Sequence, residues 1–226
     1  MNELLFIIMS LISLGFVLFA FRLGRVYLVG AIVVCAVLMN IFVVKGIYLF
    51  GLAATGGNIL YASIFLATDI LDEYWGRKIA LQAVMIGFFA SVFFLITSQL
   101  ILLYEPADFD LAHGALKTIF TLAPRIVAGS MIAYLIAQSL DVVIFNKIKK
   151  ATNYKRLWLR NLGSTLGSQL VDSVIFTVIA FAGVYPHLWQ LILFTYTIKV
   201  VVAILDTPFM YLTRKLKPRE LTETIK

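Results

Sequence analysis

The sequence predicts an all-α integral membrane protein, and three observations lead to this fold class. Apolar residues make up 62% of the 226-residue chain, and its mean hydropathy is +0.97. An ordinary globular domain is roughly 45–50% apolar. Several apolar runs reach the ~20 residues that a helix needs to cross the hydrocarbon layer, where only helices and closed barrels satisfy their own backbone. The runs leave no stretch of about 50 residues for a separate soluble domain.

About seven runs qualify as transmembrane helices. They cover residues 4–21, 26–44, 58–74, 79–104, 118–145, 162–185 and 188–212. The first resembles a secretory signal in length, but no basic segment precedes it, and Arg22 and Arg25 follow it instead. We therefore expect a retained helix. The single cysteine, Cys35, lies inside an apolar run, so disulfides contribute nothing and a small buried side chain is expected there.

Basic residues predict the orientation of the bundle, because those in the loops follow the first, third, fifth and seventh segments and so lie on one side, with only Lys45 and Lys117 near the edges of the opposite loops. The basic residues on that one side are Arg22, Arg25, Arg77, Lys78, Lys147, Lys149, Lys150, Lys155, Arg156, Arg160, Arg214, Lys215, Lys217, Arg219 and Lys226. By the positive-inside rule, the N-terminus is expected to be periplasmic and the C-terminus cytoplasmic. The net charge of +7 is then a topology signal that also contacts anionic membrane lipid, and it implies no nucleic acid.

Four charged residues, Asp69, Arg125, Asp172 and Lys199, fall near the middle of four different predicted helices. A charge at the bilayer centre costs roughly 2.5–3.5 kcal/mol, so each should be paired, hydrated or functional. We predict a mutually compensating cluster of two carboxylates and two cations at mid-depth. The alternative is that these residues form ion pairs that fix only the helix register.

Polar residues recur at helical spacing on the same segments as these charges. The stripes comprise Tyr61, Phe65, Asp69 and Asp72; Thr165, Ser168, Gln169, Asp172 and Phe176; and Thr195, Lys199 and Asp206, with Tyr196 adjacent. Polar stripes in membrane helices face a bundle interior or a water-filled cavity. A polar cavity lined by aromatic rings would suit a small, flat, polar solute.

Other signals indicate packing rather than chemistry. Gly163, Gly167 and Gly129 lie in small-residue stretches typical of close helix contacts. His113 and His187 lie far apart near the outer face, without a metal-binding motif. Phosphate-binding and nucleophile-elbow motifs are missing as well. We therefore expect no enzyme activity, no metal and no cofactor.

Several stretches together resemble the queuosine precursor transporter family, also called the vitamin uptake transporter family. They are NIFVVKGIYLFGL from Asn40, FLATDILDEYWGRKIA from Phe65, PRIVAGSMIAYLIAQSLDVVIF from Pro124, LRNLGSTLGSQLVDSVIF from Leu159 and YTIKVVVAILDTP from Tyr196. The chain departs from the family pattern at Ala62, where a proline is expected, and at Trp75, where a tyrosine is expected. The resemblance spans about residues 26–212.

The resemblance implies an N-terminal transmembrane helix over residues 1–25, a six-helix transporter core over 26–213 and a basic cytoplasmic tail over 214–226. It implies import of 7-deazaguanine precursors of queuosine, the 7-cyano or 7-aminomethyl base, across the bacterial inner membrane. The core is also similar to the substrate-binding components of energy-coupling-factor importers. The candidate substrate-binding residues are Asn40, Lys45, Asp69, Arg125, Gln169, Asp172 and Lys199; Asp69 and Glu73 could couple transport to protons, and Phe65, Phe176 or Tyr196 could stack on the base.

Two arrangements remain open at this stage. The chain could be a self-sufficient porter, or it could be the substrate-binding component of an ATP-driven vitamin importer that takes a different small planar ligand and needs a separate ATPase module. A non-transporting scaffold would leave the midplane charges unused. The sequence does not decide which deazaguanine is preferred, what drives transport or whether the protein is a homodimer.

Overall fold

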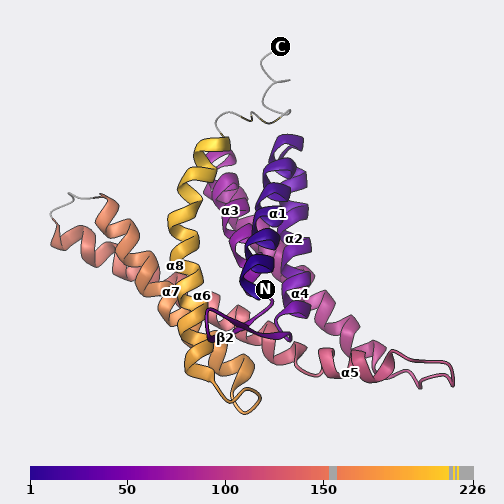
Figure 1. The fold of residues 1–226 in the computed structure, drawn as a ribbon. Coiled ribbons are helices and arrows are strands. Elements are labelled where there is room, and N and C mark those ends of the chain that lie inside the picture. The colour runs from indigo at the N-terminus through magenta and orange to yellow at the C-terminus, as the bar shows by residue number, and fades with distance from the viewer. Residues whose placement is uncertain (153–156, 214–215, 217, 219–226) are drawn as a thin grey trace.

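The computed structural model is a bundle of long helices with one small β-hairpin (Figure 1). It describes residues 1–152, 157–213, 216 and 218, except for the side chains of 59, 62, 138, 141–142, 145–146, 149, 157–162 and 202–211. The helices are α1 Asn2–Leu23, α2 Arg25–Phe42, α3 Asn58–Trp75, α4 Arg77–Ile101, α5 His113–Phe120, α6 Ala123–Ala151, α7 Leu157–Phe181 and α8 Leu188–Thr213. Six of the seven predicted segments coincide with one long helix each, and the predicted tail lies largely outside the described residues.

Single glycines make the tight turns between the first two helix pairs. Gly24 joins α1 to α2 at a φ of 130°, and Gly76 joins α3 to α4 at a φ of 86°. Side chains with a Cβ rarely adopt such angles, so glycine lets each helix reverse within one residue. Arg22, Arg25, Arg77 and Lys78 flank these turns and therefore lie at the same end of the bundle.

The predicted continuous segment over 118–145 is wrong, because the chain breaks there into α5 and α6. Pro124 stands in the first turn of α6, and the helix begins at Ala123. A proline ring clashes with the carbonyl four residues earlier, which here belongs to Phe120, the last residue of α5. Pro124 therefore starts α6 and prevents α5 from running into it. This break moves Arg125 from mid-helix to the beginning of α6.

The glycine-containing stretch between α2 and α3, which lies between two of the predicted transmembrane segments, forms an antiparallel β-hairpin. Strand β1, Gly46–Leu49, pairs with β2, Leu52–Thr55, so that Leu49 lies opposite Leu52. The turn residues Phe50 and Gly51 both have positive φ, 53° and 78°, as a tight two-residue hairpin turn requires. The hairpin lies between the two groups of helices in Figure 1.

Hydrogen bonds attach the hairpin to the first helix of the chain, α1, and to the last, α8. Asn2 Nδ2 donates to the Tyr48 carbonyl at 3.1 Å, and the Phe50 amide donates to Glu3 Oε1 at 3.2 Å. On the opposite edge, the Ala53 amide donates to Gln190 Oε1 at 3.2 Å. The hairpin is thereby held against the N-terminus of α1 and the first turn of α8.

Two apolar clusters make up most of the core. The first packs helices α1, α2, α3 and α4 together and includes Leu14, Phe21, Leu28 and Leu66. The second packs α6, α7 and α8 together and includes Ile126, Phe181 and Leu191. The predicted small-residue contacts are confirmed, since a Cβ added at Gly163 or Gly167 would meet Ile148 or Ile144 of α6 at 2.9 Å.

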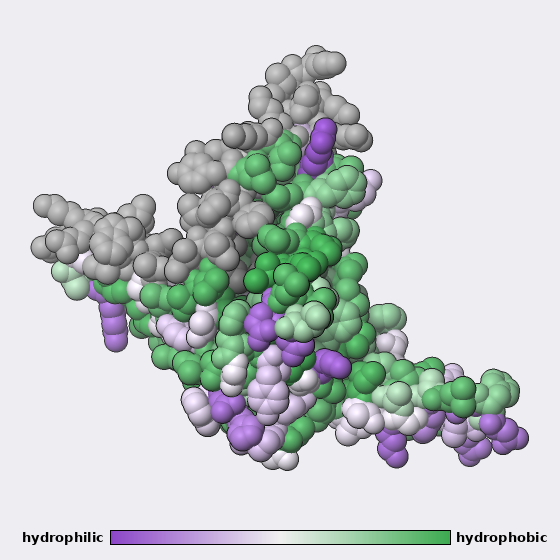
Figure 2. All heavy atoms as spheres, viewed as in Figure 1, coloured by the Kyte–Doolittle hydropathy of each residue, from purple (hydrophilic) through white to green (hydrophobic). Residues whose placement is uncertain are grey.

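The described helices include five stretches that are long and apolar enough to cross a membrane: Asn2–Leu23, Arg25–Phe42, Arg77–Ile101, His113–Ala137 and Gly163–Phe181. Figure 2 shows apolar side chains over much of the helical surface, with hydrophilic ones gathered around the hairpin and towards the loop between α4 and α5. By its sequence, α3 is more polar, because Asp69, Asp72 and Glu73 fall within its 18 residues. The chain is a multi-pass membrane protein.

Candidate functional site

A buried ion pair joins α7 to α8. The Lys199 ammonium contacts Asp172 Oδ2, and the two side chains are only 3% and 13% exposed. Burial of two charges is costly unless each satisfies the other and gains further hydrogen bonds. The predicted pairing of a midplane carboxylate with a midplane cation is therefore confirmed for these two residues.

Tyr61 of α3 contacts both members of the pair. Its hydroxyl donates to Asp172 Oδ2 at 3.3 Å, and the Lys199 Nζ lies 4.6 Å from the centre of its ring. A cation over an aromatic face is attracted by the ring quadrupole. The ring of Phe65, one turn further along α3, lies 4.7 Å from that of Tyr61. Phe65 thus packs against the tyrosine that contacts the pair, and its role in stacking on a base stays a prediction.

Asn58 and Thr195 extend the polar site towards the hairpin. Asn58 Nδ2 lies 3.5 Å from Thr195 Oγ1, and both side chains are buried. Thr195 precedes Lys199 by one helical turn, and Asn58 precedes Tyr61 by three residues, which is nearly one turn. A second hydrogen bond between α3 and α8 joins the hydroxyls of Tyr74 and Thr213 at 3.0 Å, so the two helices run parallel.

The site also contains a hydrogen-bond acceptor without a partner among the described residues. This buried atom is Gln169 Oε1, and it lies one turn before Asp172 on α7. On Asp172, both the Tyr61 hydroxyl and the Lys199 ammonium contact Oδ2. Buried polar atoms are nearly always paired in native proteins. An open acceptor on the same helix face as a buried ion pair therefore indicates a place for a ligand that offers an N–H group.

The predicted four-charge cluster is wrong in its other two members. Arg125 donates through Nε to the Ile179 carbonyl at 3.0 Å and through Nη2 to the Ala182 carbonyl at 2.8 Å. One carbonyl belongs to the last turn of α7 and the other to the residue directly after the helix, where carbonyls have no partner inside the helix. Arg125 therefore caps α7, because the break before α6 places it at the end of the bundle rather than at mid-depth.

Asp69 lies apart from the ion pair, as an exposed residue of α3. It follows Tyr61 by eight residues, a rise of about 12 Å along the helix. Asp69 lies this far from the pair because the hairpin precedes α3 and sets where the helix begins. The first residue of α3, Asn58, lies level with Thr195, which is already inside the bundle, and not level with the start of α8. Glu73 is a further turn away and also exposed.

The remaining predicted site residues are dispersed. Asn40 is buried between α2 and α4, where its Nδ2 donates to Ser91 Oγ at 3.2 Å. Lys45 is exposed just before β1, and Phe176 packs edge-on against Phe181 at 5.7 Å. Tyr196 is half-buried on α8. Side-chain positions from the family-like stretches at Ala62, Gln138, Asp141, Arg160, Asn161 and Asp206 lie outside the described residues.

Sequence analysis did not name Tyr61 or Asn58 as site residues. Tyr61 stands in the polar stripe of α3, and its spacing from Phe65 was a usable signal. No comparable signal marks Asn58, because its place in the site depends on where α3 begins after the hairpin.

A bundle of apolar helices with an ion-paired, partly unsatisfied polar site between three of them is the arrangement expected of a multi-pass membrane transporter. Comparison with known proteins agrees. Residues 55–213 match the family described as "Putative vitamin uptake transporter", and the chain belongs to this vitamin uptake transporter family.

Two relatives cover most of the chain. A protein of Bacillus subtilis (strain 168) named "Probable queuosine precursor transporter" is 41% identical over 218 residues, which are 95% of this chain and 92% of the relative. The "Queuosine precursor transporter" of Escherichia coli (strain K12) is 30% identical over 177 residues, covering 76% of this chain and 77% of the relative. No solved structure is significantly similar. Since the relatives are named as transporters, the prediction that the chain is not an enzyme agrees with them.

Proposed function

We propose that the protein imports a 7-deazaguanine precursor of queuosine, and that the base binds beside the Asp172–Lys199 pair. The observation that carries this proposal is the open buried acceptor Gln169 Oε1, one helical turn along α7 from the buried Asp172–Lys199 pair. The names of the two relatives give the substrate class. The site supplies the chemistry that this class of base requires.

The edge of a guanine-like ring matches these groups one by one. It offers N–H donors at N1 and at the 2-amino group and an acceptor at O6. Asp172 and Gln169 lie three residues apart on one face of α7 and would accept the two N–H groups. An ammonium has three N–H donors, so Lys199 can keep its bond to Asp172 and still donate to O6. Phe65 and Tyr61 provide aromatic faces for the ring.

The same geometry favours guanine-like bases over adenine. Adenine presents an amino group where guanine has O6, so its donor would face the Lys199 ammonium. A mismatch at a buried polar contact leaves both groups unpaired and costs about 1–3 kcal/mol. Selection against adenine by about tenfold or more follows from that figure.

We further infer the orientation and the energy coupling. The basic turns at Arg22, Arg25, Arg77 and Lys78 favour a cytoplasmic location for that end of the bundle, in the bacterial inner membrane. The hairpin and the N-terminus would then be periplasmic. Asp69 and Glu73, exposed on α3 towards the basic end, are the carboxylates proposed to exchange protons with the cytoplasmic side.

Replacement of Gln169 by methionine tests the binding site, because it removes the open acceptor without changing charge or size. Gln169→Met should weaken binding of 7-cyano-7-deazaguanine by about tenfold. It should leave the thermal stability of the empty protein equal or higher, since a buried unpaired oxygen is lost. Equilibrium binding and thermal unfolding of the purified protein measure both effects. Gln82→Met, at an exposed position of α4, is the matched control.

Asp172→Asn should weaken binding at least as much, because its amide NH₂ would meet a donor of the base. Asp110→Asn, in the exposed loop before α5, is the control for loss of a carboxylate. Wild-type affinity in both Gln169→Met and Asp172→Asn would remove the base from this site. Stronger binding of adenine than of 7-deazaguanines by the wild type would refute the substrate assignment.

A second candidate function follows from the family description, which names vitamin uptake. In that case the chain would be the substrate-binding component of an ATP-driven importer with another small planar ligand. Uptake of the base by the purified protein alone in liposomes would support the self-sufficient porter. Uptake only when a co-purifying ATPase is present would support the second candidate.

A further inference from the structure

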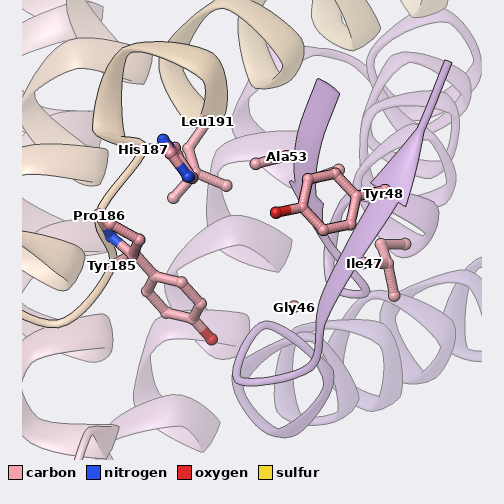
Figure 3. A pocket seen from close by; sticks show the side chains of 9 residues that line it. Gly46, Ile47, Tyr48, Ala53, Tyr185, Pro186, His187 and Leu191 are labelled. Atoms are coloured by element: carbon pink, nitrogen blue, oxygen red, sulfur yellow. The ribbon is translucent and has the colours of Figure 1, made fainter. Parts of the chain in front are cut away.

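A cavity of about 230 Å³ lies between the β-hairpin and the turn that joins α7 to α8. Figure 3 shows Tyr48 on the hairpin side, and Tyr185, Pro186 and His187 on the α7–α8 turn. Its floor is apolar and includes Ala53 and the buried Leu191. Pockets for drug-sized ligands are usually about 300 Å³ or larger, so this one suits a molecule of one or two rings.

The walls of the cavity are held in place by specific contacts. The Tyr185 hydroxyl donates to the Val44 carbonyl at 2.7 Å, and burial raises the pKa of this tyrosine, so the donor stays protonated. A Cβ added at Gly46 would lie 3.3 Å from the Tyr185 ring, which shows how closely the ring meets β1. The Ala53 bond to Gln190 fixes the other strand. The cavity is therefore preformed.

The side chains around the opening suit a flat heteroaromatic ring. Tyr48 is 61% exposed and presents its ring to the cavity across from Tyr185. His187 is exposed at the rim, and an imidazole can both donate and accept a hydrogen bond. Aromatic walls with one adaptable polar group bind nitrogen heterocycles by stacking and a single hydrogen bond.

The cavity lies on the hairpin side of the ion pair. Ala54 lines it, and the adjacent Thr55 is buried at the end of β2. Three residues later Asn58 bonds to Thr195, one helical turn before Lys199. Strand β2 thus separates the cavity from the polar site and connects the two along the chain.

We propose that this cavity is a second, outer binding site for the transported base, where the ring stacks on Tyr48 and Tyr185 and hydrogen-bonds to His187 before it reaches the Asp172–Lys199 pair. This inference rests on the proposed function. It gives Tyr48 and His187 a role in capture that is separate from recognition at the inner site.

Uptake kinetics of four single variants of the full-length protein test the outer site. Tyr48→Ala and His187→Ala should raise KM for 7-cyano-7-deazaguanine by about three- to tenfold, the effect of losing one aromatic or polar contact. The maximal rate should stay close to that of the wild type, because the inner site is intact. Tyr104→Ala and His113→Ala replace an exposed tyrosine and a half-buried histidine in the α4–α5 region, outside the cavity, and should leave KM unchanged.

Tyr48→Phe keeps the ring and should retain the wild-type KM, which distinguishes stacking from a loss of hairpin structure. Wild-type KM values in both Tyr48→Ala and His187→Ala would overturn the outer site while leaving the proposed function standing. A wild type that neither binds nor transports any 7-deazaguanine would overturn the proposed function, and the outer site with it.

Discussion

Lys199 holds its ammonium in an almost water-free position, with Asp172 as counter-charge and the Tyr61 ring beneath it. The pair gives the site a net charge close to zero and yet keeps strong hydrogen-bonding groups inside an apolar bundle. A ligand without charge can then enter at little electrostatic cost. Because each charge neutralises the other, removal of one partner would leave the other charge buried without compensation.

Lys199→Met should lower the free energy of unfolding by about 3–5 kcal/mol, because it leaves the Asp172 carboxylate buried without its counter-charge. Adding Asp172→Leu should restore much of that loss, since the double variant buries two apolar side chains instead. Thermal unfolding of the purified protein measures both effects. Lys150→Met, at an exposed position of α6, should change little. Additive losses in the double variant would mean that the two residues do not interact.

The sequence was sufficient to single out Asp172 and Lys199, because charges deep inside apolar runs are rare and need partners. It was insufficient for Arg125 and Asp69, because depth was counted from the ends of predicted segments. Arg125 lies at a helix start set by Pro124, and Asp69 lies on a helix that starts inside the bundle. An error of a few residues at a helix end moves a side chain by a whole turn or more.

Among the structural elements, the hairpin decides where the site lies. It fills the bundle between α1 and α8, and it makes α3 begin level with Thr195, so that Tyr61 meets the ion pair. No sequence pattern predicted the hairpin. Gly46–Thr55 lacks the alternation of a half-buried strand pair, and its turn residues, Phe50 and Gly51, are not the Asn-Gly or Asp-Gly pair typical of such turns. Helices were predictable because each apolar run is long; a four-residue strand leaves too few positions for a pattern.

Gly57 links the hairpin to α3 and should tolerate no larger side chain. Its φ of −64° is open to any residue, but an added Cβ would lie 2.9 Å from Val43 Cβ and 3.1 Å from the Met39 carbonyl oxygen. Gly57→Ala should therefore lower the free energy of unfolding by about 1–3 kcal/mol and weaken base binding by shifting α3.

Gly30→Ala is the matched control for Gly57→Ala, because a Cβ at Gly30 of α2 meets nothing within 4 Å. It should leave stability unchanged or raise it by up to about 1 kcal/mol, the helix preference of alanine over glycine. Equal stability of the two variants in a thermal unfolding assay would contradict the close packing at the start of α3.

At the scale of the whole molecule, the two ends of the bundle differ in chemistry. One end has the turns at Gly24 and Gly76, flanked by Arg22, Arg25, Arg77 and Lys78. The other has the hairpin, the outer cavity and the loop before α5, with its carboxylates Asp108 and Asp110. This asymmetry matches the distribution that sets membrane topology, in which short cytoplasmic loops hold the excess of lysine and arginine. The proposed direction of import, from the cavity to the ion pair, depends on it.

Cysteine labelling tests that orientation. Asp108→Cys lies in the exposed loop before α5 and leaves the Asp110 bonds to the amides of Ala112 and His113 intact. In a Cys35→Ala background, which removes the single native thiol, this cysteine should react with a membrane-impermeant maleimide from the periplasm. Lys150→Cys, at the basic end of α6, should react only after the inner membrane is permeabilised. The reverse pattern would place the outer cavity in the cytoplasm, and the base would then reach the ion pair from inside the cell.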